Sequence, residues 1–140
     1  MTEPFRVRFT VRAYELDTQG HLASAVYVQY GDHAHRECLR AAGAAPDRLR
    51  AAGIGLVTLE TTIRFRRELR ADDEVTVSCA FVWREGKTYR LEQEFRRRDA
   101  TLVAELTGLV GLVELAERKL VADPAARLRT IATNAAILGL

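Results

Sequence analysis

One long helical pattern, over residues 24–43, lies between a single strand pattern and a run of further strand patterns, and this order constrains the fold most. Apolar side chains recur on one stripe of this helix, which predicts a buried face; the stripe consists of Tyr27, Tyr30, Ala34, Cys38 and Ala41. Gly31 costs a helix about 1 kcal/mol relative to alanine, so we expect it to allow close packing against a sheet. Gly43 is a typical helix stop.

Alternating apolar and polar residues predict strands on both sides of this helix. One strand precedes the helix and four follow it, over residues 5–14, 55–67, 74–84, 88–98 and 101–117. Glu85-Gly86-Lys87 and Asp99-Ala100 are hairpin turn signals between the last three strands. Short helices are expected over residues 47–52 and 125–132. One strand, one long helix and an antiparallel meander indicate an α+β fold, and the chain length suits a single domain over residues 1–140.

Composition and charge exclude several classes of protein. No apolar run is long enough to cross a membrane, and the first residues lack the apolar core of a secretory signal. We therefore expect a cytoplasmic protein without a membrane partner, in which Cys38 and Cys79 are reduced and buried. The net charge of +2 is too small to predict nucleic-acid binding.

The polar turn over residues 15–23, between the first strand and the long helix, is the strongest candidate for chemistry. It contains the run Asp17-Thr18-Gln19-Gly20-His21-Leu22. Such a turn places a carboxylate beside the free N–H groups of a helix N-terminus, an arrangement that attacks a carbonyl and holds the resulting oxyanion. From spacing alone, an ordinary turn capped by Asp17 remains the alternative.

Other catalytic arrangements find no support in the sequence. The two serines, Ser24 and Ser78, do not lie in a Gly-x-Ser-x-Gly elbow, and Cys38 falls on the buried helix stripe. His33 and His35 point in different directions on a helix, so neither a zinc site nor any other metal site is expected. The chain has no glycine-rich phosphate loop of a known type.

Two segments of the chain resemble the hotdog-fold acyl-thioesterases, in particular the branch similar to 4-hydroxybenzoyl-CoA thioesterase. The first segment comprises Asp17-x-x-Gly20-His21-Leu22, Tyr27-Val28 and Arg36-Glu37, and the second comprises Ile63-Arg64-Phe65-Arg66-Arg67 and Asp72-Asp73-Glu74-Val75. The resemblance extends over about residues 5–128. It implies an antiparallel sheet wrapped around a central long helix, no cofactor, and hydrolysis of acyl-CoA or acyl-carrier-protein thioesters.

The resemblance also assigns roles to individual residues. Asp17 takes the family's catalytic position, as general base or nucleophile. For His21 two roles stay open, either orienting Asp17 or water, or a purely structural role in the turn. The oxyanion donor is a backbone N–H near Ser24, whose side chain is alternatively a plain N-cap. Some family members continue the motif as His-x-Asn-Asn, whereas this chain has His21-Leu22-Ala23-Ser24. Expected substrate-binding residues are Gln19, Gly20, Tyr27, Arg64, Arg66 and Arg67.

Two arginine clusters have two interpretations. Arg64, Arg66 and Arg67, with Arg70, form one cluster, and Arg96 to Arg98 form the other. Both are either solvated strand ends or a rim that binds the phosphates of a phosphopantetheine carrier.

Two alternative functions and one assembly follow from the same resemblance. A hotdog dehydratase or lyase is one alternative, although the Gly-Pro or His-Pro segment typical of that class is missing. A non-catalytic subunit that binds an acyl carrier is the other. An exposed sheet edge, together with the family's assembly, predicts a homodimer or a homotetramer built from dimers.

Overall fold

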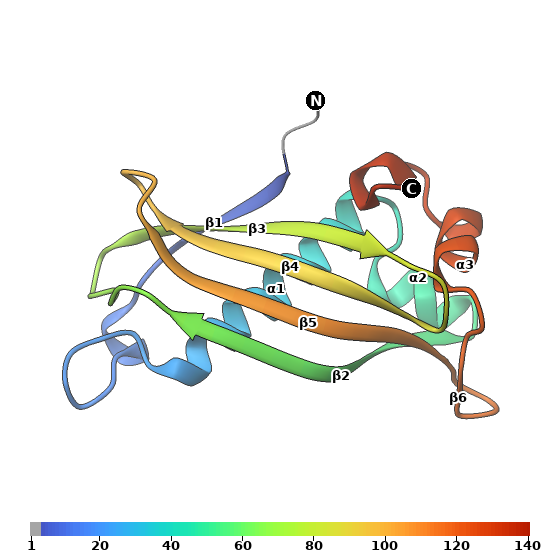
Figure 1. Ribbon diagram of the computed structural model, residues 1–140, viewed down its shortest axis with the longest axis horizontal. Helices are drawn as coiled ribbons and strands as arrows, with labels where there is room; N and C mark the ends of the chain where they lie inside the picture. The colour runs from blue at the N-terminus through green and yellow to red at the C-terminus, as the bar shows by residue number, and fades with distance from the viewer. Residues whose placement is uncertain (1–3) are drawn as a thin grey trace.

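The computed structural model describes residues 4–140, and its helices and strands follow the predicted order (Figure 1). The first half contains β1 (Phe5–Thr10), the 3₁₀ helix η1 (Ala13–Glu15), α1 (Ser24–Ala41), α2 (Pro46–Ala51) and β2 (Ile54–Phe65). The second half contains β3 (Glu74–Trp83), β4 (Thr88–Arg97), β5 (Leu102–Glu114), β6 (Lys119–Leu120), α3 (Pro124–Ile131) and the 3₁₀ helix η2 (Ala135–Leu138).

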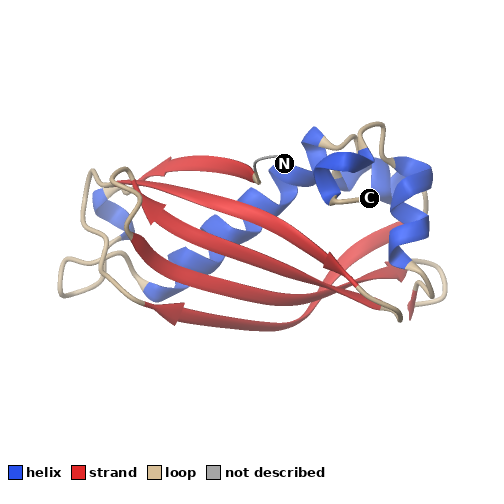
Figure 2. Ribbon diagram, turned by 45° about the horizontal axis from the view of Figure 1, so that its top comes forward, coloured by secondary structure: helices blue, strands red, loops and turns tan. Residues whose placement is uncertain are grey.

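The strands form one antiparallel sheet in the order β1-β3-β4-β5-β2, with β6 paired to β5. The sheet curls, and α1 crosses its concave face as a single long helix (Figure 2). The helix contacts β1 and β3 most, while β2 forms the far edge of the sheet. This is the expected α+β arrangement of an antiparallel sheet wrapped around a central helix.

The stripe predicted on α1 is buried over most of its length. Tyr27, Tyr30, Ala34 and Cys38 lie in the core, whereas Ala41 is exposed and the next residue, Ala42, is buried. Cys79 is also buried, and neither cysteine forms a disulfide in the part of the chain that the structure describes. The periodicity of the sequence therefore predicts correctly which face of α1 is buried.

Element ends differ from the sequence predictions by a few residues. The first strand stops at Thr10 rather than at residue 14, and the long helix stops at Ala41 rather than at residue 43. Gly43 follows with φ +81°, the left-handed conformation expected of a helix stop. The last long strand ends at Glu114 instead of residue 117, because the chain turns there into β6, a short strand that the sequence pattern does not predict. No helix over residues 4–140 is long and apolar enough to span a bilayer.

Backbone hydrogen bonds bring two distant loops together at the N-terminal end of α1. The Leu22 N–H donates to the Leu69 carbonyl at 2.7 Å. The Val11 N–H donates to the Asp73 carbonyl at 2.9 Å, and the Asp72 N–H donates to the Val11 carbonyl at 2.9 Å. The segment between β2 and β3 is therefore fixed against the turn between β1 and α1, while α2 and α3 lie at the opposite end of the molecule (Figure 1).

Candidate active site

The turn before α1 is closed by its own backbone. The Asp17 N–H donates to the His21 carbonyl at 2.7 Å, and the Gly20 N–H donates to the Asp17 carbonyl at 3.1 Å. Gly20 has φ +81°, a conformation that glycine adopts without strain. A β-bridge joins Leu16 to Leu22, so the turn is a rigid loop and Asp17 is held at its base.

One oxygen of the Asp17 carboxylate is used by this turn. Oδ1 accepts hydrogen bonds from the N–H of Gln19 at 2.9 Å and from the N–H of His21 at 3.1 Å. These backbone donors, His21 first, lower the pKa of the Asp17 carboxyl below its usual value, because they favour the ionised form. Oδ2 has no hydrogen-bond donor within residues 4–140. Asp17 is therefore a carboxylate with one oxygen fixed and one oxygen free.

Asp17 opens onto a shallow cleft of about 370 Å³ at the start of α1. The wall combines apolar and charged residues from the turn, from α1 and from the segment after β2: Asp17, His21, Leu22, Ser24, Tyr27, Phe65, Arg66, Arg67 and Glu68. The cleft thus brings together six of the nine residues expected from the sequence. Gln19, Gly20 and Arg64 do not line it: Gln19 contributes its N–H to Asp17, and Arg64 lies exposed on β2.

The start of α1 supplies backbone donors to this cleft. Ala23 is the N-cap and Ser24 is the first helical residue, so the alternative of Ser24 as a plain N-cap is wrong. No side chain caps the helix start, and the first N–H bonded there is that of Val26, which donates to the Ala23 carbonyl at 2.9 Å. The N–H groups of Ser24 and Ala25 precede it at the positive end of the helix dipole. They can therefore bind an anionic oxygen.

Tyr27 forms the inner wall of the cleft. Its ring packs edge-on against Phe65, with centroids 5.0 Å apart, and lies 5.6 Å from the ring of Phe95. Burial raises the pKa of the Tyr27 phenol, so the hydroxyl stays neutral at physiological pH. An apolar group in the cleft would lie against Tyr27 and Phe65, which both line it.

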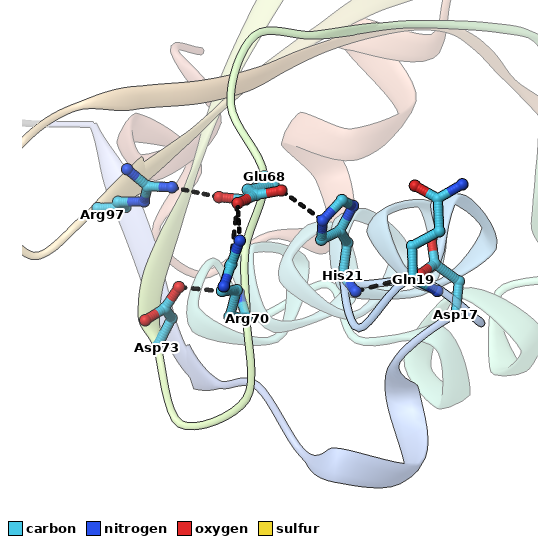
Figure 3. A network of polar contacts seen from close by, with 7 residues as sticks. All are labelled: Asp17, Gln19, His21, Glu68, Arg70, Asp73 and Arg97. Atoms are coloured by element: carbon cyan, nitrogen blue, oxygen red, sulfur yellow. Dashed lines mark hydrogen bonds and ion pairs between the residues drawn. The ribbon is translucent and has the colours of Figure 1, made fainter.

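Glu68 also lines the cleft, although it is not among the site residues predicted from the sequence. Its Oε2 lies 2.5 Å from His21 Nε2, and its Oε1 accepts hydrogen bonds from Arg70 Nε at 2.9 Å and Nη2 at 2.7 Å (Figure 3). The Arg70 guanidinium lowers the pKa of the Glu68 carboxyl, which is therefore ionised. No motif in the sequence marks this residue; only its place after Ile63-Arg64-Phe65-Arg66-Arg67 gave a signal.

The two arginine clusters lie in different places. Arg66 and Arg67 line the Asp17 cleft, and Arg66 forms an ion pair of 3.5 Å with Glu105. Arg96, Arg97 and Arg98 line a separate depression of about 260 Å³ together with Arg6 and Arg8. The second cluster already has partners: Arg96 pairs with Glu94 at 3.1 Å, Arg98 pairs with Glu74 at 3.8 Å, and Arg97 donates to the Glu68 carbonyl.

Solved structures similar to this chain are thioesterases and hypothetical proteins. The hypothetical protein SAV2348 from Staphylococcus aureus, determined in complex with CoA, matches with a TM-score of 0.82 and 19% identity over 91% of this chain and 82% of its own. A hypothetical protein from Aquifex aeolicus has a TM-score of 0.82 and 26% identity, over 91% and 99% of the two chains. Slr0204, a 1,4-dihydroxy-2-naphthoyl-CoA thioesterase from Synechocystis, has a TM-score of 0.81 and 18% identity, over 92% and 96%. These likenesses confirm the hotdog fold.

Sequence comparison gives the family. The acyl-acyl carrier protein thioesterase ATL3 of Arabidopsis thaliana, a chloroplastic protein, is 36% identical over 79 residues, which are 56% of this chain and 42% of that protein's length. The thioesterase-like superfamily matches residues 11–131, a span that includes the turn, α1 and all the long strands after α1. The chain therefore belongs to the thioesterase-like superfamily, and the family expected from the sequence is confirmed.

Proposed function

We propose that this protein hydrolyses acyl thioesters of coenzyme A or of an acyl carrier protein to a free acid and a thiol. The observation that carries this proposal is the free Oδ2 of an ionised Asp17, placed in a cleft that is also lined by Ser24, the first residue of α1. A nucleophilic oxygen and an anion site in one cleft are the two requirements of acyl transfer.

Asp17 is the nucleophile in this proposal. Backbone donors hold the pKa of its carboxyl low, so the group is ionised but a weak base, and general-base catalysis works best with a pKa near the working pH. Oδ2 attacks the thioester carbonyl, the C–S bond breaks, and the thiolate leaves with the acyl group transferred to Asp17. An alkyl thiolate is a good leaving group because the pKa of its thiol is only about 8.5. Water then releases the acid from the acyl-Asp17 intermediate.

The start of α1 holds the oxyanion of the attack. Negative charge develops on the carbonyl oxygen, and the N–H groups of Ser24 and Ala25 are the donors at the positive end of the helix. The Ser24 side chain lines the same cleft. A preorganised donor of this kind typically contributes about 3–4 kcal/mol to stabilisation of the transition state.

The comparisons support the class of substrate without selecting one carrier. SAV2348 was determined with CoA, Slr0204 acts on a naphthoyl-CoA, and the Arabidopsis relative acts on acyl carrier protein. In this chain, Arg66 and Arg67 at the mouth of the cleft suit the phosphates that both carriers have in common. Tyr27 and Phe65 suit the acyl group.

We propose that the working unit is a homodimer or a homotetramer built from two dimers. β2 is the outer strand of the sheet, and α1 packs mainly against β1 and β3 at the other side. As a result Leu59 and Phe65 on β2 are 49% and 50% exposed. A second copy would cover this apolar edge, and since Phe65 lines the Asp17 cleft, the partner would also border the site.

A thiol-release assay tests the proposal against its two alternatives. Short-chain, long-chain and aromatic acyl-CoAs, together with acyl carrier proteins, are incubated with the protein while a thiol reagent reports the free thiol. We expect release from at least one substrate class at a rate proportional to protein. A dehydratase or lyase leaves the thioester intact, and so does a carrier-binding subunit, so absence of release from every substrate would exclude the hydrolase.

A further inference from the structure

Glu68 fixes the orientation of the His21 ring in the Asp17 cleft. The two oxygens of its carboxylate have different tasks, since Oε1 accepts both hydrogen bonds from Arg70 and Oε2 lies 2.5 Å from His21 Nε2. A carboxylate held by two donors of one guanidinium cannot rotate freely. The ring of His21 is consequently held facing Glu68, while its backbone N–H donates to Asp17 (Figure 3).

The backbone around Glu68 is anchored as firmly as its side chain. The Arg97 guanidinium donates to the Glu68 carbonyl, and the Arg70 N–H donates to Asp73 Oδ2 at 2.9 Å. The Leu69 carbonyl accepts the Leu22 N–H at 2.7 Å. Glu68 and His21 thus lie on two loops that are joined directly, unlike the partners of an ordinary surface ion pair, which are free to separate.

The contact also decides which ring nitrogen is available. The Glu68 carboxyl is ionised, because Arg70 lowers its pKa, and a carboxylate is an acceptor only. Nε2 of His21 must therefore carry the proton that faces Glu68. Nδ1 has no hydrogen-bond partner in the part of the chain that the structure describes, so it is the nitrogen that can accept a proton in the cleft.

We propose that Glu68 is a positioning residue of the hydrolysis, which holds His21 so that Nδ1 accepts the proton of the attacking water. This inference rests on the proposed function. In the step concerned, the water oxygen bonds to the acyl carbon, the bond between that carbon and Asp17 breaks, and one water proton moves to Nδ1. Asp17 is regenerated as a carboxylate, and the imidazolium passes its proton to solvent. A base oriented by a third group is the general pattern of an activated nucleophile.

Glu68→Gln tests the role, because glutamine keeps the size of the side chain and removes its charge. We expect the steady-state kcat for thiol release to fall at least about tenfold, a part of what general-base catalysis contributes. KM should fall with it and kcat/KM should stay unchanged, because the slowed step follows the attack by Asp17 and the loss of the thiol. His21→Gln should lower kcat as well, and the double variant should lose no more than the larger single loss, because both changes remove one unit. Losses that multiply would show independent roles and overturn the proposal.

The matched control is Glu37→Gln. Glu37 also pairs with a histidine, His33, at 3.9 Å, but this pair lies on the exposed side of α1 and outside the cleft. We expect kcat of this variant to equal that of the unchanged protein. A tenfold loss here would mean that removing any such charge slows the reaction, and it would contradict a specific role for Glu68.

The ¹⁵N signals of the histidine rings test the contact without substrate. The chain has three histidines. In Glu68→Gln, we expect the His21 signals to shift and those of His33 and His35 to stay in place. Unchanged His21 signals would overturn the inference, whereas shifted signals in a protein that releases no thiol would reject the proposed function alone. If Glu68→Gln does not fold, Arg70→Gln replaces it with the same expectations, because it removes the group that orients Glu68.

Discussion

The side-chain amide of Gln93 on β4 donates a hydrogen bond of 2.8 Å to the backbone carbonyl of Gly31 in α1. A Cβ atom on Gly31 would lie 2.7 Å from Gln93 Oε1, so the helix can approach the sheet this closely only because residue 31 has no side chain. The packing role expected of Gly31 is confirmed. This contact sets the distance between α1 and the sheet, and with it the place of Tyr27 at the cleft.

Gly31→Ala is therefore expected to destabilise the protein although alanine favours helices. Overpacking typically costs about 1–3 kcal/mol, which exceeds the gain of about 1 kcal/mol in helix propensity. Thermal unfolding measures the change as a lower Tm. Gln29→Ala, at an exposed position of the same helix, is the control and should leave Tm unchanged or raise it. An unchanged Tm in Gly31→Ala would show that Gln93 yields without cost.

Buried His35 makes stability depend on acidity. Its Nε2 lies 3.1 Å from the Tyr89 hydroxyl, and burial, with a smaller contribution from Arg36, lowers the pKa of its ring to about 4. The unfolded chain has a His pKa of about 6.5, so it binds the proton more readily than the folded chain between these two values. The contribution of His35 to stability is complete above pH 6.5 and is lost as the pH falls toward 4.

Denaturant unfolding at a series of pH values measures this loss. We expect the free energy of unfolding to decrease by a few kcal/mol between pH 6.5 and 4, in the range of a pKa difference of this size. His33→Gln should keep the whole dependence because His33 is exposed, whereas His35→Gln should remove most of it. Identical pH curves for the two variants would contradict the assignment to His35.

Arg66 and Arg67 are expected to bind the phosphates of the carrier. Replacing either with alanine should raise KM several-fold for an acyl-CoA but much less for an acyl-pantetheine without the nucleotide. kcat should stay nearly constant, because the contact is the same in the ground state and the transition state. Added salt should likewise raise KM of the unchanged protein more for the acyl-CoA than for the acyl-pantetheine, since exposed charges are screened over about 8–10 Å.

Two control variants separate this role from general effects of charge. Arg48→Ala removes an exposed arginine of α2, far from the cleft. This variant should leave KM unchanged for both the acyl-CoA and the acyl-pantetheine. Arg98→Ala tests the second arginine cluster, whose members already bind acidic side chains or carbonyl groups. Equal changes of KM for both substrates in every variant would exclude phosphate binding by Arg66 and Arg67.

The exposed apolar edge of β2 predicts an assembly that one substitution weakens. Leu59 is 49% exposed at the irregularity in β2 between Thr58 and Glu60. Leu59→Lys places a charge on this edge and should shift the protein from dimer or tetramer toward monomer in light scattering. Tyr14→Lys is the control, because Tyr14 is 85% exposed but belongs to η1 and not to the edge strand β2. A monomeric unchanged protein that hydrolyses thioesters at low micromolar concentration would contradict the predicted assembly.

The periodicity of the sequence was sufficient to predict that the long helix and the long strands exist, but it did not predict the residues at which they end. Tyr27, Tyr30 and Ala34 recur at helical spacing because they all face one sheet, so the spacing alone predicts which face of the helix is buried. The end of β1 depends instead on the bonds of Val11 with the segment at Asp73, which comes much later in the chain. Contacts of this kind leave no local signal, and β6 and η2 were missed for the same reason.

The candidate site likewise contains residues that a local motif predicts and one residue that it does not. Asp17, His21, Ser24 and Tyr27 lie within one short stretch, so a local motif was enough to group them, and the structure brings all four to one cleft. Glu68 reaches His21 only because the Leu22 N–H bonds the Leu69 carbonyl, a pairing of two loops that spacing does not reveal. The catalytic roles of Asp17, His21 and Ser24 stay predictions.

The most direct test is the rate of thiol release by Asp17→Asn. Asparagine keeps the shape of the side chain and can still accept hydrogen bonds from the N–H groups of Gln19 and His21, so the turn should stay intact. Without the carboxylate the attack on the thioester carbonyl is lost, so kcat on the best substrate should fall at least about 100-fold. Thr18→Ala, an exposed neighbour in the same turn, should keep full activity. Turnover close to that of the unchanged protein in a folded Asp17→Asn variant would contradict Asp17 as the catalytic group.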